Sequence, residues 1–455
     1  MTPGEPIAGP GGSQARDLAD ALFASIAERP VVSIHNGLPA RYLAEDLPIT
    51  DPVNLLIAHD QGVQALLRAH DVRLDPSPAA DWKTRESRCA FALLWNHLVA
   101  VRARPWMEQD GDHIAELAGL PPFRAGQDPD VVYDRLAAQL AERPVHPRRA
   151  LAGTGVARLA TSDDPTDDLH AHAVLRQDPA WAGRVIPTFS PDRYLEPGRR
   201  GWRTDAELLA ETTDIETGDL DGFLGALRRR REYFINHGTV VSEHHVSDVG
   251  VARLAEREAA ELYRLAVRAE LLPEEALALQ RHLLWELGAM SAEGDGLVMA
   301  LYPPAGFHAD SRAATDDHGV AARIRPLLDD FGSRPGFRLW LFAIDLDAYL
   351  DEILPLAGDH PALTAVPPTR FADDPADLRA VRITAVRAIG AGRVLGMVDD
   401  MSGPFALAER HRLGRRLDAG ALAQLVAEGH LDEDQAYLEL SAALDRSLLP
   451  RPRGV

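Results

Sequence analysis

The stretch VARLATSDDPTDDLHAH, at Val156–His172, contains the local pattern on which the fold assignment depends. It begins with a short run of apolar and β-branched residues, Val156–Ser162, which is typical of a strand. An aspartate-rich turn containing Pro165 follows, and an amphipathic segment around His172 then has helical spacing. A strand followed by a helix is the repeating unit of a parallel α/β sheet.

The same alternation recurs along the chain. Further runs with strand character are Val31–Asn36, Arg184–Phe189, Thr239–His244, Gly296–Tyr302, Arg338–Ile344, Ala362–Pro367 and Arg393–Asp399. Helix candidates between them include Leu220–Phe234, Val251–Glu270, Pro273–Ala292 and Leu346–Leu356. Eight strands separated by helices predict an α/β protein with a (β/α)8 barrel. An open doubly wound sheet is the main rival, but no glycine-rich phosphate loop follows the first strand.

We expect residues 1–455 to form a single barrel domain. The interval of about residues 51–150 has helical but little strand character, which predicts a helical insertion above the barrel mouth. The glycine- and proline-rich residues 1–14 predict a disordered start. Closing helices are expected at the end of the chain, over Ala406–Leu417, Gly420–Glu428 and Asp432–Leu448.

Composition excludes several classes of function. The net charge of −21 argues against a nucleic-acid partner, and no apolar run approaches the length that spans a bilayer. With one cysteine, Cys89, and no secretion signal, we expect a cytoplasmic protein. Lys83 is the only lysine, which makes Schiff-base chemistry improbable.

Reactive groups of a parallel barrel lie at the carboxyl ends of its strands. Candidates there are His35, Asp163, Asp164, His244 and Asp400. Asp400 lies beside Asp399, and two neighbouring like charges favour a raised carboxylate pKa. Structural roles remain open for several residues: strand-end contacts for His35, turn or cap contacts for Asp163 and Asp164, and packing for His97 and His172.

Seven segments resemble the uronate (glucuronate) isomerase family of the amidohydrolase superfamily. The most specific is TSDDPTDDLHAH, Thr161–His172, which resembles TTDDPxDsLxxH. HGTVVSEHH, His237–His245, resembles HGcrvsDHg, and IPTFSPDR, Ile186–Arg193, resembles LPtfRPDk. The others are IHNGLPARYLAED (Ile34–Asp46), WNHL (Trp95–Leu98), GMVDDMSGPF (Gly396–Phe405) and ERHRLGRRL (Glu409–Leu417).

The resemblance implies a divalent metal held by two histidines of the first strand and an aspartate of the eighth. Here His35 and Asp400 take two of these positions, but Gly37 occupies the third and has no ligating side chain. Stable catalytic zinc sites have three protein ligands. We therefore expect zinc to be weakly bound or absent.

The resemblance also implies contacts to a substrate carboxylate. Ser190 and Ser402 stand where the family has arginines, so two bidentate carboxylate contacts are lost. Candidate substrate-binding residues are Asp60, Arg68, His97 and Arg370, of which Arg370 could substitute for a lost arginine.

These observations predict aldose–ketose isomerisation of a hexuronate such as D-glucuronate, with Asp400, His244, Asp164 and Asp163 as catalytic candidates. The expected partner is a small sugar acid, and a homo-oligomer is possible. Two alternatives stay open: a metal-poor barrel that acts on a different substrate, and a non-catalytic binding descendant.

Overall fold

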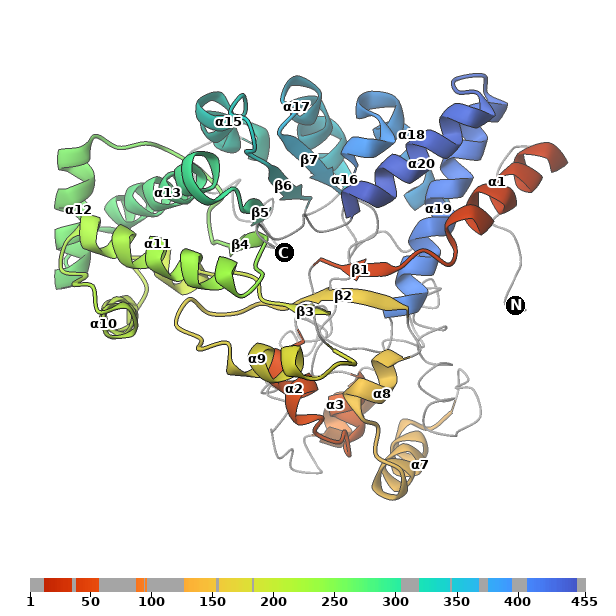
Figure 1. Cartoon of the computed structure of the whole chain (residues 1–455), viewed down its shortest axis with the longest axis horizontal. Helices are drawn as coiled ribbons and strands as arrows, with labels where there is room; N and C mark the ends of the chain where they lie inside the picture. The colour runs from red at the N-terminus through yellow and green to blue at the C-terminus, as the bar shows by residue number, and fades with distance from the viewer. Residues whose placement is uncertain are drawn as a thin grey trace.

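The computed structural model describes residues 12–34, 38–56, 87–93, 95, 127–152, 155–181, 184–303, 319–343, 346–367, 375–394 and 407–447. Seven parallel strands form its centre (Figure 1). They are β1 (Val31–Ser33), β2 (Val156–Ala160), β3 (Val185–Ile186), β4 (Val241–His245), β5 (Val298–Tyr302), β6 (Leu339–Phe342) and β7 (Leu363–Val366).

The strands form two groups, and within each group every strand pairs with the next strand in the chain. The hydrogen-bonded orders are β1-β2-β3 and β4-β5-β6-β7, and a parallel bridge from Phe189 to Ser242 joins the two groups. Val394 forms a parallel bridge with Ala365 of β7, at the start of the expected eighth strand. The rest of that strand lies outside the described residues.

A single apolar cluster lies inside the strands. Every described strand contributes at least one residue to this cluster, and two further members, Ile34 and Val240, lie directly beside β1 and β4. The members are Val32, Ile34, Ala160, Ile186, Val240, Val241, Val298, Ala300, Trp340 and Val366. Strands that share one interior surround it, as the strands of a barrel do. The predicted α/β class with consecutive parallel strands is confirmed.

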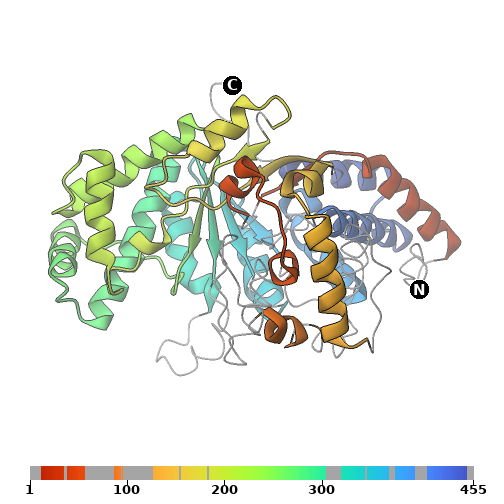
Figure 2. The same cartoon turned by 90° about the horizontal axis from the view of Figure 1, so that it is seen from below.

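Helices cover the outer faces of the strands. They include α9 (His170–Gln177), α10 (Trp202–Thr213), α11 (Leu220–Asn236), α12 (Glu256–Arg268), α13 (Pro273–Met290), α15 (Val320–Phe331), α16 (Leu346–Ala348), α17 (Leu354–Asp359) and α18 (Pro375–Ile389). Figure 2 shows α10–α13 on one side of the strands and the C-terminal helices on the opposite side. A large second cluster, which includes Met299, Leu301 and Leu341, fills the layer between strands and helices.

The expected insertion is helical where it is described. It contains α3 (Pro52–Leu56), α7 (Pro129–Glu142) and most of α8 (Pro147–Ala152), and α2 (Ala40–Glu45) precedes it. One antiparallel bridge, between Ile49 and Val145, ties the insertion to the chain before α3. None of the described helices is long and apolar enough to cross a membrane.

Residues 1–11 of the stretch expected to be disordered lie outside the described residues. Helix α1 covers Ser13–Ile26, and its Leu22 and Ile26 are buried against the C-terminal helices. One expectation about the other end of the chain is corrected. A single helix, α19 (Leu407–Ala427), replaces the two that were expected before α20 (Glu433–Ser447). Burial of neighbouring Ala419, Ala421 and Leu422 outweighs the ~1 kcal/mol cost of glycine within a helix.

Arg415 of α19 connects this helix to the start of β1. Its side chain is 7% exposed. Its guanidinium donates to the carbonyls of Ile26 (3.1 Å), Ala27 (2.9 Å) and Pro30 (3.0 Å). These bonds satisfy the end of α1 and fix the backbone that enters β1 at Val31.

We expect Arg415→Lys to lower the free energy of unfolding by about 1–3 kcal/mol, because one ammonium cannot reach all three carbonyls. The apparent melting temperature should fall by a few degrees. The neighbouring Arg416→Lys is the control, since Arg416 is exposed and lysine can keep its contact above the Phe23 ring. Equal melting temperatures for the two variants would contradict the role of Arg415.

Candidate active site

Strand β4 presents two different sets of side chains to its two faces. Val241 belongs to the interior cluster and pairs with Val298, and two residues on, Glu243 pairs with Ala300. Ser242 and His244 alternate with them and pair with Met299 and Leu301, which face the helices. Because successive strand residues point to opposite faces, Glu243 and His245 face the interior and His244 does not.

The Glu243 carboxylate lies where three strands end. It is 2% exposed, and its Oε1 accepts hydrogen bonds from Ser190 Oγ, at 2.5 Å, and from Ser162 Oγ. Ser162 follows β2 and Ser190 follows β3, so residues after two other strands hold a carboxylate of β4. Ser190 therefore supplies a neutral hydroxyl to this group.

His245 forms the other polar group of this face. Its backbone N–H donates to Asp192 Oδ1 at 2.9 Å, and its ring Nδ1 lies 3.1 Å from Asp192 Oδ2. The ring stacks on Tyr302 of β5, with 4.2 Å between centroids, and Tyr302 stacks on Phe342 of β6 at 3.9 Å. Burial raises the pKa of Asp192, and the contacts with His245 oppose that shift.

Asp163 points away from this interior, toward helix α9. Its Oδ2 accepts from Thr161 Oγ1 (2.6 Å) and the Thr188 N–H (3.2 Å), and it lies 3.6 Å from His172 Nε2. Burial raises the pKa of Asp163 to about 7, and burial with the charge of Arg176 lowers the pKa of His172 to about 4. Both groups are held in or near their neutral forms between strand and helix.

His244 is also buried behind the strands, which corrects the expectation that it faces the mouth. Its Nε2 lies 3.1 Å from Ser242 Oγ, which accepts from Arg231 at 3.2 Å. Burial and the charge of Arg231 lower the pKa of His244 to about 3. The imidazole is therefore neutral and packed against α11, out of reach of a ligand in the barrel interior.

Asp164 lies in the turn after β2 and is engaged in an ion pair. Arg193 contacts both of its carboxylate oxygens, at 2.7 and 2.8 Å. The same carboxylate accepts from the N–H and hydroxyl of Thr166. This arrangement fits the turn and cap contacts that the sequence left open for Asp164.

The remaining predicted site residues are His35, Gly37, Asp60, Arg68, His97, Arg370 and Asp400, and all of them lie outside the described residues. Within the described part of the chain, no three His, Cys, Asp or Glu side chains are grouped so that they could hold a metal. The metal and substrate assignments for these residues stay predictions.

Sequence reasoning overlooked Glu243, His245, Asp192 and Tyr302 as site residues. A signal was present for two of them, because the two-residue alternation that starts at Val241 places Glu243 and His245 on the same face. Which face is interior depended on the partners in β5, and the strand alone does not contain that information.

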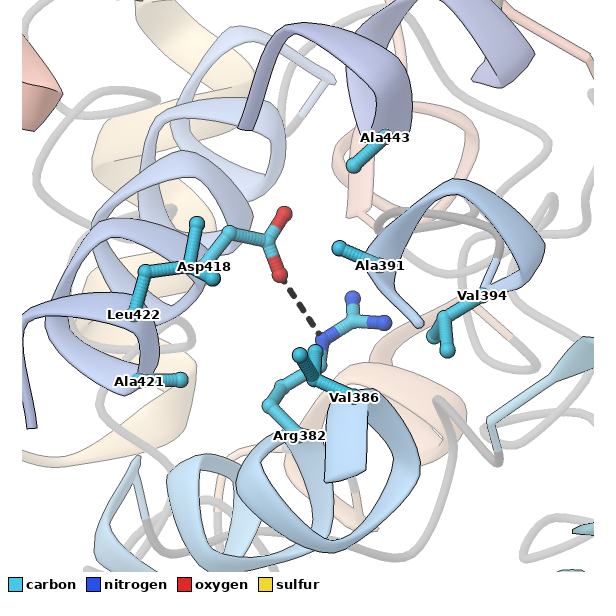
Figure 3. A pocket seen from close by; sticks show the side chains of 8 residues that line it. All are labelled: Arg382, Val386, Ala391, Val394, Asp418, Ala421, Leu422 and Ala443. Atoms are coloured by element: carbon cyan, nitrogen blue, oxygen red, sulfur yellow. Dashed lines mark ion pairs between the residues drawn. The ribbon is translucent and has the colours of Figure 1, made fainter. Parts of the chain in front are cut away.

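A small cavity elsewhere in the fold is unsuited to a substrate. It lies among α18, α19, α20 and the turn at Ala391–Arg393, and has a volume of about 10 Å³. Arg382 and Asp418 point toward each other in it, 3.0 Å apart (Figure 3). Burial raises the pKa of Asp418 and the guanidinium opposes this. The space suits at most one water molecule.

The pKa of Asp163 predicts a dependence of stability on pH. Its carboxyl keeps a proton to about pH 7 in the folded chain, against about pH 4 when unfolded. Below about pH 4 the carboxyl is protonated in both the folded and the unfolded chain. Between about pH 4 and 7 only the unfolded chain loses this proton, so the free energy of unfolding falls as pH rises through this range. Asp163→Asn, a neutral isostere, should avoid that loss.

The melting temperature of Asp163→Asn minus that of the wild type should therefore grow across this window and level off above it. Asp168→Asn is the control, because Asp168 is exposed and should give a constant difference. A constant difference for Asp163→Asn as well would show that Asp163 titrates as an ordinary carboxylate.

The chain is similar to known proteins of one family. The model of a family described as glucuronate isomerase matches residues 14–313. A uronate isomerase of Cutibacterium acnes is 34% identical over 440 residues, which covers 93% of each chain.

Solved structures agree. The crystal structure of a glucuronate isomerase from Caulobacter crescentus has a TM-score of 0.82 at 27% identity, and the match covers 96% of this chain and 94% of that one. A uronate isomerase from Thermotoga maritima, at 22% identity and a TM-score of 0.79, shares the fold over 95% of this chain and 97% of its own. On the extent of these matches, the chain belongs to the glucuronate (uronate) isomerase family.

Proposed function

We propose that this protein is an enzyme that interconverts the aldose and ketose forms of a hexuronate. One observation carries the proposal: the similarity to uronate isomerases extends over nearly the whole chain, so it includes the strand ends where the polar groups gather. The reaction moves a proton between adjacent carbons through an enediol, and it needs a base and groups that orient the sugar.

We assign the carbon base to Asp400 and a binding role to Glu243. Glu243 faces the interior, and the hydrogen bonds from Ser162 and Ser190 fix the orientation of its carboxylate toward a bound sugar. Asp163, Asp164 and His244, also predicted as catalytic, then act indirectly, because their described contacts hold strands and turns in place.

We further propose that a divalent metal such as zinc binds weakly through His35 and Asp400. The donor set supports weak binding, since a histidine and an aspartate are suitable ligands and Gly37 offers none. When bound, such a metal would polarise the carbonyl oxygen of the substrate.

An assay coupled to ketose formation, with D-glucuronate and D-galacturonate, tests the function. We expect measurable but slow turnover, because Ser190 and Ser402 cannot form the bidentate contacts that orient a carboxylate. Asp400→Asn should abolish turnover, since an amide is not a base. The absence of turnover with either uronate in the wild type, or full turnover in Asp400→Asn, would contradict the assignment.

Glu243→Gln tests the binding role. We expect kcat/KM to fall about 10- to 100-fold, because a hydrogen bond to a charged group contributes about 1.5–3 kcal/mol. Glu232→Gln on the exposed face of α11 is the matched control and should leave the rate unchanged. Equal rates for both variants would remove Glu243 from the site.

Gly37→His tests the metal proposal. The added imidazole should raise the zinc content of purified protein, measured by elemental analysis after dialysis against a chelator, because it supplies a third ligand. The wild type should retain less than one zinc per chain under these conditions. Stoichiometric zinc in the dialysed wild type would show that another residue completes the site.

A further inference from the structure

His245 combines two features that no other residue of β4 combines. It faces the barrel interior, opposite Tyr302 in the register of β4 and β5. Its side chain is 36% exposed, so a ligand can approach it, whereas His244 is completely buried on the other face.

The ring is held in one orientation by contacts on two sides. Asp192 binds the backbone N–H and ring Nδ1 of His245 with separate carboxylate oxygens, at 2.9 and 3.1 Å. Tyr302 stacks on the ring face with an interplanar angle of 13°. An ionised Asp192 can only accept, so Nδ1 carries the hydrogen and Nε2 is the basic nitrogen of the neutral ring.

The geometry points to His245 as a further proton-transfer group of the site, with Asp192 as the residue that positions it. This inference rests on the proposed hexuronate isomerisation. Glu243 lies two residues away on the same strand face, about 6.6 Å between Cα atoms at the usual strand rise. A sugar hydroxyl bound by Glu243 would therefore place neighbouring oxygens near the imidazole.

The proposed step moves a hydroxyl proton and consumes no co-reactant. The carbon base removes the C2 proton, the C2–H electron pair forms the C1–C2 double bond, and the electrons of the C1 carbonyl move onto its oxygen. His245 Nε2 accepts the proton of the C2 hydroxyl and donates it to the C1 oxygen. C2=O then forms as the double-bond electrons take the proton from the carbon base at C1, so His245 and the base both end each turnover in their starting forms.

Four variants test this assignment by the assay with D-glucuronate and D-galacturonate. His245→Ala should lower kcat about 100-fold or more while KM changes little, because general acid–base catalysis contributes about 10²–10⁴-fold. Added imidazole should restore part of the lost rate in His245→Ala. His430→Ala, at an exposed turn before α20, is the matched control and should behave as wild type and show no response to imidazole.

Asp192→Asn separates positioning from a merely structural role. We expect it to lower kcat about tenfold on its own and to have no further effect in the His245→Ala background, since it acts through that ring. An undiminished kcat in His245→Ala, or an equal effect of Asp192→Asn in both backgrounds, would overturn the inference.

A second measurement does not depend on turnover. In protein labelled at histidine ring carbons, the His245 signal, assigned by its loss in His245→Ala, should shift when D-glucuronate is added. The absence of turnover in the wild type would refute the proposed isomerisation. The NMR titration would then test only whether His245 lies at the site where the sugar acid binds. An unchanged His245 signal would overturn the assignment even in an active enzyme.

Discussion

The parallel register of β4 against β5 is the constraint on which the site depends. Pairing Val241 with Val298 sends every second residue of β4 into the barrel, so Glu243 and His245 reach the interior and His244 faces α11. A shift by one residue would exchange these roles and bury two polar groups among the helices. The apolar contacts on both faces of the sheet therefore fix the register that places Glu243 and His245 in the interior.

Buried polar groups on the outer face of the strands form hydrogen bonds that link neighbouring strands and helices. Asp163 joins the ends of β2 and β3 through Thr161 and the Thr188 N–H, and His172 closes the same cluster from α9. His244 completes a similar chain with Ser242 and Arg231. Desolvation disfavours charge in each imidazole and in Asp163, so these motif residues contribute hydrogen bonds without the cost of buried ions.

The interior face of β4 combines a serine-bound carboxylate with an oriented imidazole. Serine at position 190 places a hydroxyl against Glu243 where an arginine would form an ion pair. An imidazole at position 245, with Asp192 beside it and Tyr302 stacked on it, occupies space next to this carboxylate. The proposed role of His245 would make this side of the interior suited to proton transfer.

The sequence by itself determined the strand order, most element positions and the family, because hydrophobic periodicity and collinear motifs are local properties of the chain. It could not decide which motif residues face the interior. His244 matches the histidine of the motif that the sequence resembles, but the inward face of β4 is set by its partners in β5. Only the tertiary structure determined that face, since pairing between distant segments fixes the side to which each residue points.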